Sequence, residues 1–460
     1  MDQTFDAWYI MIRKGHLRMG TEAHPRVHQL EVTMHGDRWN TPELPTYGNK
    51  CIAMREGTLD IHGTERSVTW SVLTQTAEAG ATEITVLDAG DWTVGDHIVL
   101  ASSDFDHKES EEHEITGVVG NTITLKDPLA NRHFGEIEQY DGIDVDMRCE
   151  VGLLTRNIKI HGVGEHATNE ERHGAHIFIF SPGDETSVGR IENLELFNAG
   201  QAFALGRYPI HFHMIGNVRK SYIKKCAVYN TFNRAFTIHG VHHLTLMNNV
   251  AYNNMGHTFF IEDGVETHNH LESNLGISTI ASWSLLMTDQ TPATFWITNP
   301  TNKFINNHAA GSDRYGFWFD FPDSGKPMGP SAAIGAHMCI HGMELGEWTN
   351  NWAHSNGRYG LRIFHVLVPL SNPCVSPYDG SSETPWDENP PVTANFNGLT
   401  SYKNGRNGAT AERLGDVRWN NFKVVDNKFA GLEMTYTGYA KEWETVGIYD
   451  ALVVGTSNGN

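Results

Sequence analysis

The second half of the chain repeats a short unit that often follows a pair of asparagines. Segments reading "AVYNTFNRAFTIHG" and "VAYNNMGHTFFIED" begin 23 residues apart, at Ala227 and Val250, and related segments begin at His308 and Trp352. Each unit has a strand of small or apolar residues, a polar turn and a second apolar strand. Three of these segments follow an Asn-Asn pair: Asn248-Asn249, Asn306-Asn307 and Asn350-Asn351. A repeat of this length, built from strands, predicts a solenoid.

The spacing of the apolar residues decides which kind of solenoid this is. They alternate with a period of two, which is typical of strands and excludes helical repeats of about 33 residues or more. The ladder of leucines that a leucine-rich repeat requires is missing. We therefore predict an all-β fold, a right-handed parallel β-helix whose coils stack about 4.8 Å apart. Asparagines would stack at the turns, and Ile, Val, Phe and Leu would fill the interior.

The first part of the chain has a different pattern. Residues 1–145 contain strand–glycine–strand units such as "YIMIRKGHLRMGTEAHP", "MREGTLDIHGTERSVTW" and "DWTVGDHIVLASS". A solenoid needs a cap over its open end. We predict that residues 1–145 form a glycine-rich β cap and that residues 146–460 form the β-helix.

Composition narrows the class of protein. The net charge of −21 disfavours nucleic acid and anionic membranes as partners. No stretch approaches the roughly 20 apolar residues of a membrane helix. The five cysteines include no CxxC pair, so a zinc knuckle is not expected, and they neither require nor exclude an oxidising compartment. The strand pattern is already present at "MDQTFDAWYI", where no signal peptide is recognisable, and we interpret the chain as a fragment of a longer protein.

Aligning the coils predicts a column of polar side chains on the outside of the β-helix. One inward position is filled by Ile210, Ile238, Ile261 and Phe319. The residue that follows each of them points outward, which gives the polar column His211, His239, Glu262 and Asp320. Further candidate residues lie close to this column in the sequence: His213, His257 and Asp263.

The column supports three readings, which the residues alone do not separate. Two imidazoles and a carboxylate are a common ligand set for zinc and similar metals, so His211, His239 and Glu262 are candidate metal ligands. The same groups, with His257 and Asp263, are candidates for general acid–base catalysis on a glycan. The third reading is a solvated polar ladder without chemistry, because chance neighbours are expected among 26 histidines.

Several residues are candidates for binding a substrate beside the column. Arg207 is positioned to clamp a sugar carboxylate, or else to form a salt bridge with an acid of a turn. A second column at the turn contains Arg234 and Tyr315, and tyrosines there would either stack on sugar rings or cover the turn.

Longer motifs resemble a known family. The segments "LGRYPIHFH", "TIHG", "GHTFFIEDG", "TFWITNPTNKFINNHAAGSDRYGFWF" and "NNWAHSNGRYGL" resemble the β-helix of the cell-migration-inducing hyaluronan-binding proteins, their transmembrane relative and fibrocystin-L. The stretches "HLRMGTEAHP" and "GTLDIHG" resemble the domain of these proteins that is named for its eight glycines. The resemblance runs from about residue 14 to residue 440.

The resemblance implies an extracellular, glycan-facing β-helix. Two members of the family are associated with depolymerising hyaluronan, whereas fibrocystin-L is a cell-surface and coat protein that is not a recognised enzyme. The family motif has the same residue at these positions of the chain: Arg207, His211, His213, His239, Gly240, His257, Glu262, Asp263 and His354. Asp320 departs from the hyaluronan-degrading members, which have an apolar residue there, and their long insertion between the "EDG" and "FW" coils is shortened here.

These observations predict an extracellular or cell-surface protein that binds and depolymerises an acidic polysaccharide such as hyaluronan, as a hydrolase or a lyase. A divalent ion, zinc-like or calcium, is the only cofactor that the residues suggest. The alternative is a non-catalytic coat ectodomain of the fibrocystin-L type. The chemistry requires that His211 and His239 face the same side of the molecule on neighbouring coils.

Overall fold

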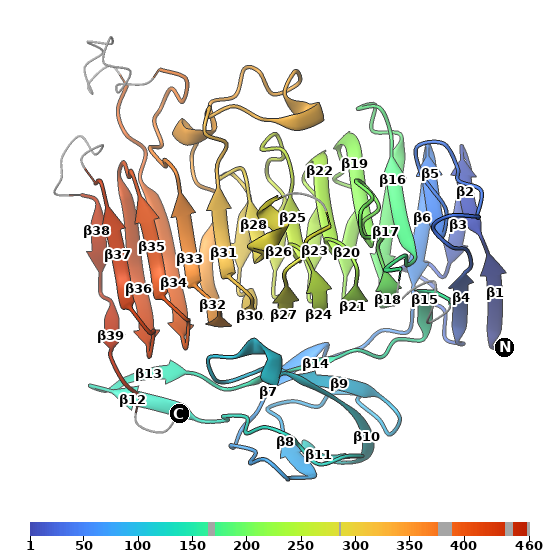
Figure 1. Cartoon of the computed structure of the whole chain (residues 1–460), viewed down its shortest axis with the longest axis horizontal. Coiled ribbons are helices and arrows are strands. Elements are labelled where there is room, and N and C mark those ends of the chain that lie inside the picture. Colours follow the sequence, from blue (N-terminus) through green and yellow to red (C-terminus); the bar gives the residue numbers. More distant parts are fainter. Residues whose placement is uncertain (164–170, 285–286, 376–388, 438–444, 458–460) are drawn as a thin grey trace.

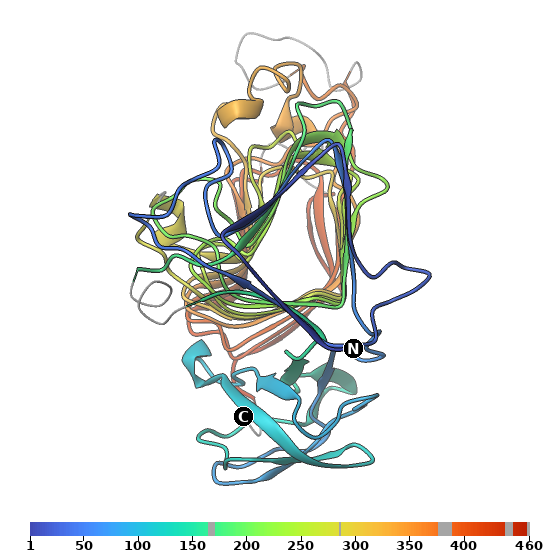
Figure 2. The same cartoon turned by 90° about the vertical axis from the view of Figure 1, so that its right-hand side faces the viewer.

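The chain folds into a long β-helix with a small β domain attached to one side. A computed structural model describes all residues except 164–170, 285–286, 376–388, 438–444 and 458–460. In the described part, strands of successive coils pair in parallel, and the coils have a triangular outline when viewed down their common axis (Figures 1 and 2). The prediction of an all-β fold with a parallel β-helix is confirmed. None of the helices in the described ranges has the length and apolar character needed to cross a membrane.

One face of the β-helix is a single parallel sheet, which we call the site sheet. Its strands follow one another in chain order. They are β2 (Tyr9–Arg13), β5 (Cys51–Arg55), β16 (His176–Phe180), β19 (Ile210–Asn217), β22 (Phe236–His242), β25 (Phe259–Ile261), β28 (Ala293–Ile297), β31 (Tyr315–Asp320), β33 (Tyr359–Phe364), β35 (Asn407–Glu412) and β37 (Ala430–Thr435).

The other faces of the β-helix are built from a second set of parallel strands. They are β1 (Gln3–Ala7), β3 (His16–Met19), β4 (Leu30–Met34), β6 (Gly57–His62), β15 (Ile158–Gly162), β17 (Ser187–Glu192), β18 (Leu194–Ala199), β20 (Tyr222–Lys224), β21 (Ala227–Thr231), β23 (Thr245–Met247), β24 (Val250–Met255), β26 (His270–Glu272), β27 (Leu275–Ile280), β29 (Lys303–Ile305), β30 (His308–Ser312), β32 (Trp348–Asn356), β34 (Ala394–Tyr402), β36 (Val417–Val425), β38 (Gly447–Tyr449) and β39 (Leu452–Val454).

The small domain, which we call the side domain, lies against the β-helix below the coils in Figures 1 and 2. Apolar residues of the two parts, such as Ile98 and Leu275, share one buried cluster. Its strands pair antiparallel. Its elements are β7 (Trp70–Val72), β8 (Glu83–Thr85), β9 (His97–Leu100), η1 (His107–Glu109), β10 (Glu111–Val119), β11 (Thr122–Leu125), β12 (Ile137–Tyr140), β13 (Ile143–Asp146) and β14 (Glu150–Leu153).

The expected domain boundary at residue 145 is wrong. Strand β1 pairs in parallel with β4, and β4 pairs in parallel with β15, so β1 to β6 already form coils of the β-helix. The separate antiparallel domain begins only at β7. Strand–glycine–strand units occur in both architectures, and the period of two does not tell whether the next strand is parallel or antiparallel.

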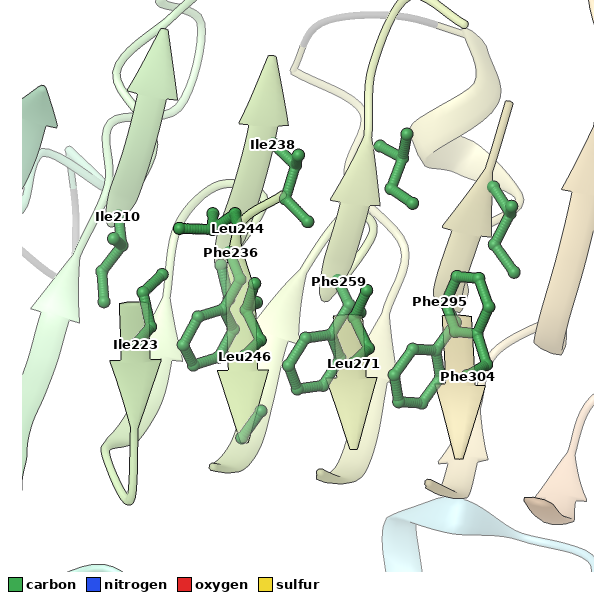
Figure 3. Close-up of a cluster of buried hydrophobic side chains, with 14 of the residues drawn as sticks. Ile210, Ile223, Phe236, Ile238, Leu244, Leu246, Phe259, Leu271, Phe295 and Phe304 are labelled. Atoms are coloured by element: carbon green, nitrogen blue, oxygen red, sulfur yellow. The ribbon is translucent and has the colours of Figure 1, made fainter. Parts of the chain in front are cut away.

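Identical inward positions of successive coils carry stacked aromatic rings. The centroids of Phe236 and Phe259 lie 4.8 Å apart, and those of Phe259 and Phe295 lie 4.6 Å apart. Ile210 occupies the same position of β19, opposite Phe236. Figure 3 shows these side chains in a row inside the β-helix. Because each inward residue packs on its equivalents in the coils above and below, the core fixes the heights of the outward residues as well.

The asparagine pairs of the sequence form a ladder inside one turn. The second residue of each pair belongs to one ladder with Asn274, and the ladder is Asn249, Asn274, Asn307 and Asn351. Asn249 donates to the side-chain oxygen of Asn274 (2.8 Å), and Asn274 donates in turn to Asn307 (3.0 Å). The first residue of each pair has positive φ, as at Asn248 (φ 55°), a conformation that asparagine tolerates. The expected stacking of asparagines is confirmed.

Two connections lie against the site sheet. Residues 281–292 contain the short helix η3 (Met287–Gln290), and residues 321–347 contain η4 (Gly329–Ser331) and η5 (Ile340–Gly342). Figure 1 shows the second connection above the coils. Asp289 of the first connection binds the side chain of Arg234, which precedes β22, and Ser331 of the second binds that of Asp263, which follows β25.

Candidate functional site

His213, rather than His211, lies opposite His239. The register of β19 and β22 pairs His213 with His239 and His211 with Thr237. The predicted column is therefore shifted by two residues at this strand, although the pairing of Ile238 with Ile261 is as expected. A shift of two residues keeps every side chain on its side of the sheet, so the apolar pattern could not detect it.

His211 and His239 nevertheless face the same side, as the proposed chemistry requires. Their rings are stacked, with centroids 5.7 Å apart and an angle of 5° between the planes. The expectation that both are exposed is wrong, since His211 is 1% and His239 is 4% exposed. Tyr208 packs against His211, and the backbone of Ser331 reaches Asp263 from the connection above.

Five side chains form what we call the histidine–carboxylate cluster: His211, His213, His239, Glu262 and Asp263. His239 is its centre. Its Nε2 lies 2.9 Å from Oδ2 of Asp263, and its Nδ1 lies 3.1 Å from Oε2 of Glu262. The same Nδ1 lies 3.0 Å from Nδ1 of His213. The cluster thus combines residues of strands β19 and β22 with the two residues that follow β25.

Burial and neighbouring charges together shift the pKa values of the cluster. Burial lowers the pKa of His239, but the carboxylates of Glu262 and Asp263 outweigh burial and raise it to about 9. Burial and the charge of His239 lower the pKa of His213 to about 3. Burial raises the pKa of Glu262 despite its contacts with His239 and Arg234. At neutral pH the cluster therefore holds a cationic imidazole beside a neutral one.

A buried cation lies behind Glu262. The Arg234 guanidinium is fully buried and forms two hydrogen bonds to Asp289 of η3, at 3.0 and 2.9 Å. It also donates to the Tyr208 hydroxyl (3.1 Å) and lies 3.6 Å from Oε1 of Glu262. The expected role of Arg234 as an accessible substrate-binding residue is not supported, because its donors are used inside the protein.

Glu266 is a functional candidate that the sequence analysis missed. Its carboxylate accepts hydrogen bonds from the backbone of Gly240 (2.8 Å) and Gly264 (2.8 Å). Burial raises its pKa to about 7, although His239 opposes the shift. Glu266 holds the backbone on both sides of the cluster. The acidic run "IEDGVE" signals a turn rich in carboxylates, but Tyr208, Asp289 and Ser331 had no comparable signal.

A pocket of about 530 Å³ lies beside the cluster. Its lining includes Met214 and Gly240, the residues that follow His213 and His239, and Phe180 of β16. The Phe180 ring lies 5.4 Å from the ring of His213. His213 is half-buried, and the Glu262 side chain is 13% exposed, so these two are the cluster members that a ligand can approach.

Two other predicted site residues lie beside the cluster rather than in it. Arg207 donates to the backbone carbonyl of Thr46 (2.6 Å) and is half-buried. His257 is fully buried, and its ring stacks on that of Phe260 with a centroid distance of 5.4 Å. Burial lowers the pKa of His257 to about 3, and its Nε2 lies 3.7 Å from Oδ1 of Asp289.

Three further predicted site residues lie outside the cluster: Tyr315, Asp320 and His354. Tyr315 is 1% exposed, and its hydroxyl accepts a hydrogen bond from Arg362 (3.1 Å), so it is not available to stack on a sugar. Asp320 ends β31, and β28 lies between that strand and β25 of the cluster. His354 lies on β32, where it is hydrogen-bonded to Glu150 of the side domain (3.0 Å).

Two groups of side chains have the ligand types and spacing that a metal ion requires. One ring nitrogen each of His211, His213 and His239 lie within 4.8 Å of one another, and the same holds for ligand atoms of His239, Glu262 and Asp263. His239 belongs to both groups. Of the expected ligands, His211 belongs to the first group and Glu262 to the second, and His239 connects them.

Comparison with known families identifies two matches in the chain. Residues 172–361 match the model of the CEMIP beta-helix, and residues 1–74 match the model of the G8 domain. The first match covers the strands of the cluster, and the second covers β1 to β7.

Relatives over most of the chain include fibrocystin-L of Mus musculus, which is 40% identical over 91% of this chain and 10% of its own length. The cell surface hyaluronidase CEMIP2 of Homo sapiens is 32% identical over 76% of this chain and 28% of its own length. The tailspike gp61 of Pseudomonas phage phi297 shares 9% identity, with a TM-score of 0.22 over 98% of this chain and 66% of its own. The chain spans about a tenth of the length of the fibrocystin-L proteins that it matches.

Proposed function

Since the chain carries the CEMIP beta-helix and G8 domains and is homologous to fibrocystin-L and to the CEMIP proteins, we propose that it binds and cleaves an extracellular acidic glycan. Hyaluronan or a related uronic-acid polymer is the substrate class that we propose. The histidine–carboxylate cluster is the proposed place of the reaction.

The observation that carries this proposal is the contact between His213 and His239. Their Nδ1 atoms lie 3.0 Å apart, a separation at which two imidazoles share one proton. Asp263 and Glu262 flank His239 and hold positive charge on the pair. We propose that a molecule bound in the neighbouring pocket receives this proton, since the pocket is lined by Met214 and Gly240, which follow the two histidines.

A shared proton suits the cleavage of a glycosidic bond. The pair donates the proton to the leaving oxygen while the bond to the sugar carbon breaks, and it recovers a proton from the water that adds to that carbon. The protein is thus unchanged after one turnover, and one water is consumed. In the lyase alternative the pair recovers its proton from the ring carbon that carries the carboxylate of the uronate, and no water is consumed.

An acidic polymer requires local cations on a chain with a net charge of −21. The Arg55 guanidinium lies 5.5 Å from the centre of the Phe180 ring, which lines the pocket. The Arg55 side chain is 42% exposed, and its Nε lies 3.7 Å from Glu56. We propose Arg55 as the group that binds a uronate carboxylate, a role that the sequence analysis assigned to Arg207.

An extracellular location belongs to this proposal. Cys339 and Cys374 form a disulfide, and disulfides form and persist in oxidising compartments. The three remaining cysteines are buried. One relative carries the printed name of a cell surface hyaluronidase.

A second candidate function is that of a non-catalytic coat ectodomain. It is favoured by the higher identity to fibrocystin-L, 40% over 91% of the chain, compared with 32% over 76% for CEMIP2. In that case the cluster would serve folding or ion binding alone.

The test is chain-length analysis of fluorescent hyaluronan, chondroitin and heparan sulfate after incubation with the purified chain. Shortening of at least one polymer, lost in His213→Gln and retained in the surface variant His243→Gln, supports the proposal. If the folded chain shortens none of them, the coat ectodomain replaces the enzyme as the preferred function.

A further inference from the structure

The cluster contains more hydrogen-bond acceptors than its protons can satisfy. Nδ1 of His211 lies 3.0 Å from the carbonyl oxygen of Gly206, which only accepts, so Nδ1 carries the hydrogen and Nε2 has a lone pair. His211 is 1% exposed, and within the described part of the chain its Nε2 has no hydrogen-bond partner.

Around His239, too, the acceptors outnumber the available hydrogens. Its Nε2 faces the Asp263 carboxylate at 2.9 Å and therefore carries a hydrogen. Its Nδ1 faces two acceptors, Nδ1 of His213 at 3.0 Å and Oε2 of Glu262 at 3.1 Å. One proton on Nδ1 serves only one of them. Oε2 of Glu262 is buried and receives no hydrogen bond from the residues that the structure describes.

Buried acceptors without donors are costly, on the order of 1–3 kcal/mol for each atom. Here one ring nitrogen each of His211, His213 and His239 lie within 4.8 Å of one another. Oε2 of Glu262 lies 3.1 Å from Nδ1 of His239, the histidine at the centre of this group. A divalent cation satisfies all of these lone pairs at once, which one proton does not. In a tetrahedral zinc site, ligand nitrogens lie about 3.3 Å apart, close to the 3.0 Å between His213 and His239.

We propose that His211, His213, His239 and Glu262 form a binding site for a divalent metal ion of the zinc class. Three imidazoles and one carboxylate are ligands that zinc, cobalt and nickel prefer, whereas calcium prefers six to eight oxygens. Of the two ions that the sequence suggested, the nitrogen-rich cluster favours the zinc-like one.

The proposed ligands are oriented by hydrogen bonds with neighbouring groups, as is typical of metal sites. The Gly206 carbonyl fixes the tautomer of His211, and the Asp263 carboxylate fixes that of His239. Asp263 is itself held by the backbone N–H of Ser331 (3.0 Å). Glu262 lies 3.6 Å from the buried Arg234, which restricts the positions of its carboxylate.

This inference concerns the same side chains as the proposed function, but it does not rest on glycan cleavage. A bound ion of this class would supply an activated water molecule to the site. The ion would also displace the proton between His213 and His239, so the metal-bound and protonated forms are alternatives.

The test measures metal binding by the whole chain without any glycan. The purified protein is treated with chelator, dialysed and titrated with Zn²⁺ or Co²⁺, and the bound metal is determined by elemental analysis. We expect one equivalent per chain, visible absorption bands of Co²⁺ bound by nitrogen ligands, and no displacement by excess Ca²⁺. In His213→Gln the affinity for Co²⁺ should fall at least tenfold, and in His243→Gln it should stay unchanged.

Melting curves of the metal-free proteins show whether each variant is folded, and the Co²⁺ spectrum of the unaltered chain tests the site even if a variant does not fold. The inference is overturned if the folded wild-type chain takes up no stoichiometric Zn²⁺ or Co²⁺, or if His213→Gln binds as tightly as the wild type. Cleavage without metal uptake would overturn this inference alone. Metal uptake without cleavage would overturn only the proposed function.

Discussion

His213 of β19 and His239 of β22 face each other across neighbouring coils, with their Nδ1 atoms 3.0 Å apart. Neither strand supplies the site alone, since Glu262 and Asp263 follow the next strand, β25. The site thus exists only where three coils are stacked in the correct register. Its geometry depends on the core that sets this register and on the groups that orient each ring.

Asp263→Asn should weaken the site while leaving the fold intact. The amide of the variant lacks the negative charge that attracts the N–H of His239 Nε2, although its oxygen can still accept a hydrogen bond from the backbone of Ser331. Loss of such a supporting carboxylate typically costs roughly 10–100-fold in metal affinity or activity. Co²⁺ titration and hyaluronan cleavage measure the effect. Asp323→Asn is the matched control, because Asp323 pairs with His365 (2.8 Å) at an 84% exposed position; an equal loss in both variants would contradict the role of Asp263.

Ile238→Ala should destabilise the β-helix by about 2–5 kcal/mol, because it removes a buried aliphatic side chain and leaves a cavity. Ile238 is 1% exposed and lies opposite Ile261 in the next coil. Urea denaturation followed by tryptophan fluorescence measures the change. Val453→Ala, at a 54% exposed position of β39, serves as the control. A cost below that of the control would mean that the coil relaxes into the space.

Asn274→Ala should cost about 2–4 kcal/mol, since several buried hydrogen bonds are lost together. The Asn274 amide donates to Leu246 (3.0 Å) and to Asn307 (3.0 Å), and its oxygen accepts from Asn249 (2.8 Å). Thermal denaturation compares it with Asn253→Ala, whose residue is half-buried and donates only to Asn230 (2.7 Å) among the residues that the structure describes. The prediction fails if the two variants melt at the same temperature.

The sequence predicted the coil architecture because its signals are local. The asparagines at 249, 307 and 351 and the aromatic residues at 259 and 295 each pack on their equivalents one coil away, so the repeat in sequence is the repeat in space. Four residues of the cluster, His211, His213, His239 and Glu262, each follow an inward residue of a strand, and this local pattern is what indicated them in the sequence.

Register, burial and partners were not predictable in this way. Moving β19 by two residues exchanges His211 for His213 opposite His239 without changing which side chains face inward. Asp263, the partner of His239, is held by Ser331 of residues 321–347, a segment that lies far along the chain and has no repeat pattern. Arg234 and Asp289 likewise meet across a connection, and no spacing between positions 55 residues apart reveals their contact.

Acid should loosen the side domain. Burial would raise the pKa of Glu111, but hydrogen bonds from His133 and from the backbone at 130 and 131 outweigh it and lower the pKa to about 2. Glu150 has its pKa lowered in the same direction, since His354 and His308 outweigh its burial. A carboxylate whose pKa is lower in the folded state than in the unfolded state stabilises the fold at pH values above the ordinary carboxylate pKa of 4.5. This stabilisation is lost as the pH falls from 4.5 towards 2. Hydrogen exchange of β9 to β14 between pH 6 and pH 3 measures the loss.

Glu150→Gln should remove part of this dependence on pH and destabilise the contact of the side domain with the β-helix. Glu150 is 1% exposed and hydrogen-bonded to His308 (2.5 Å) and His354 (3.0 Å), and removing one charge of a buried group of this kind costs about 3–5 kcal/mol. Glu112→Gln is the control, because the side chains of Glu112 and its partner His97 are 34% and 48% exposed and solvent-exposed pairs are worth less than about 1 kcal/mol. Equal exchange rates in the side domains of both variants would show that Glu150 does not hold the contact.

Gly329→Ala should disturb the cluster through the connection that covers it. Gly329 has φ +60°, and a Cβ atom there would lie 2.5 Å from Oδ1 of Asp263, so either the carboxylate or η4 must move. We expect at least a tenfold loss of Co²⁺ affinity with little change in the melting of the β-helix, because the core is untouched. Gly80→Ala is a matched control for the backbone strain alone, since Gly80 has φ +90° and open space around its Cβ position. If both variants bind Co²⁺ like the wild type, the cover does not position Asp263, and His239 must be oriented by Glu262 and His213 alone.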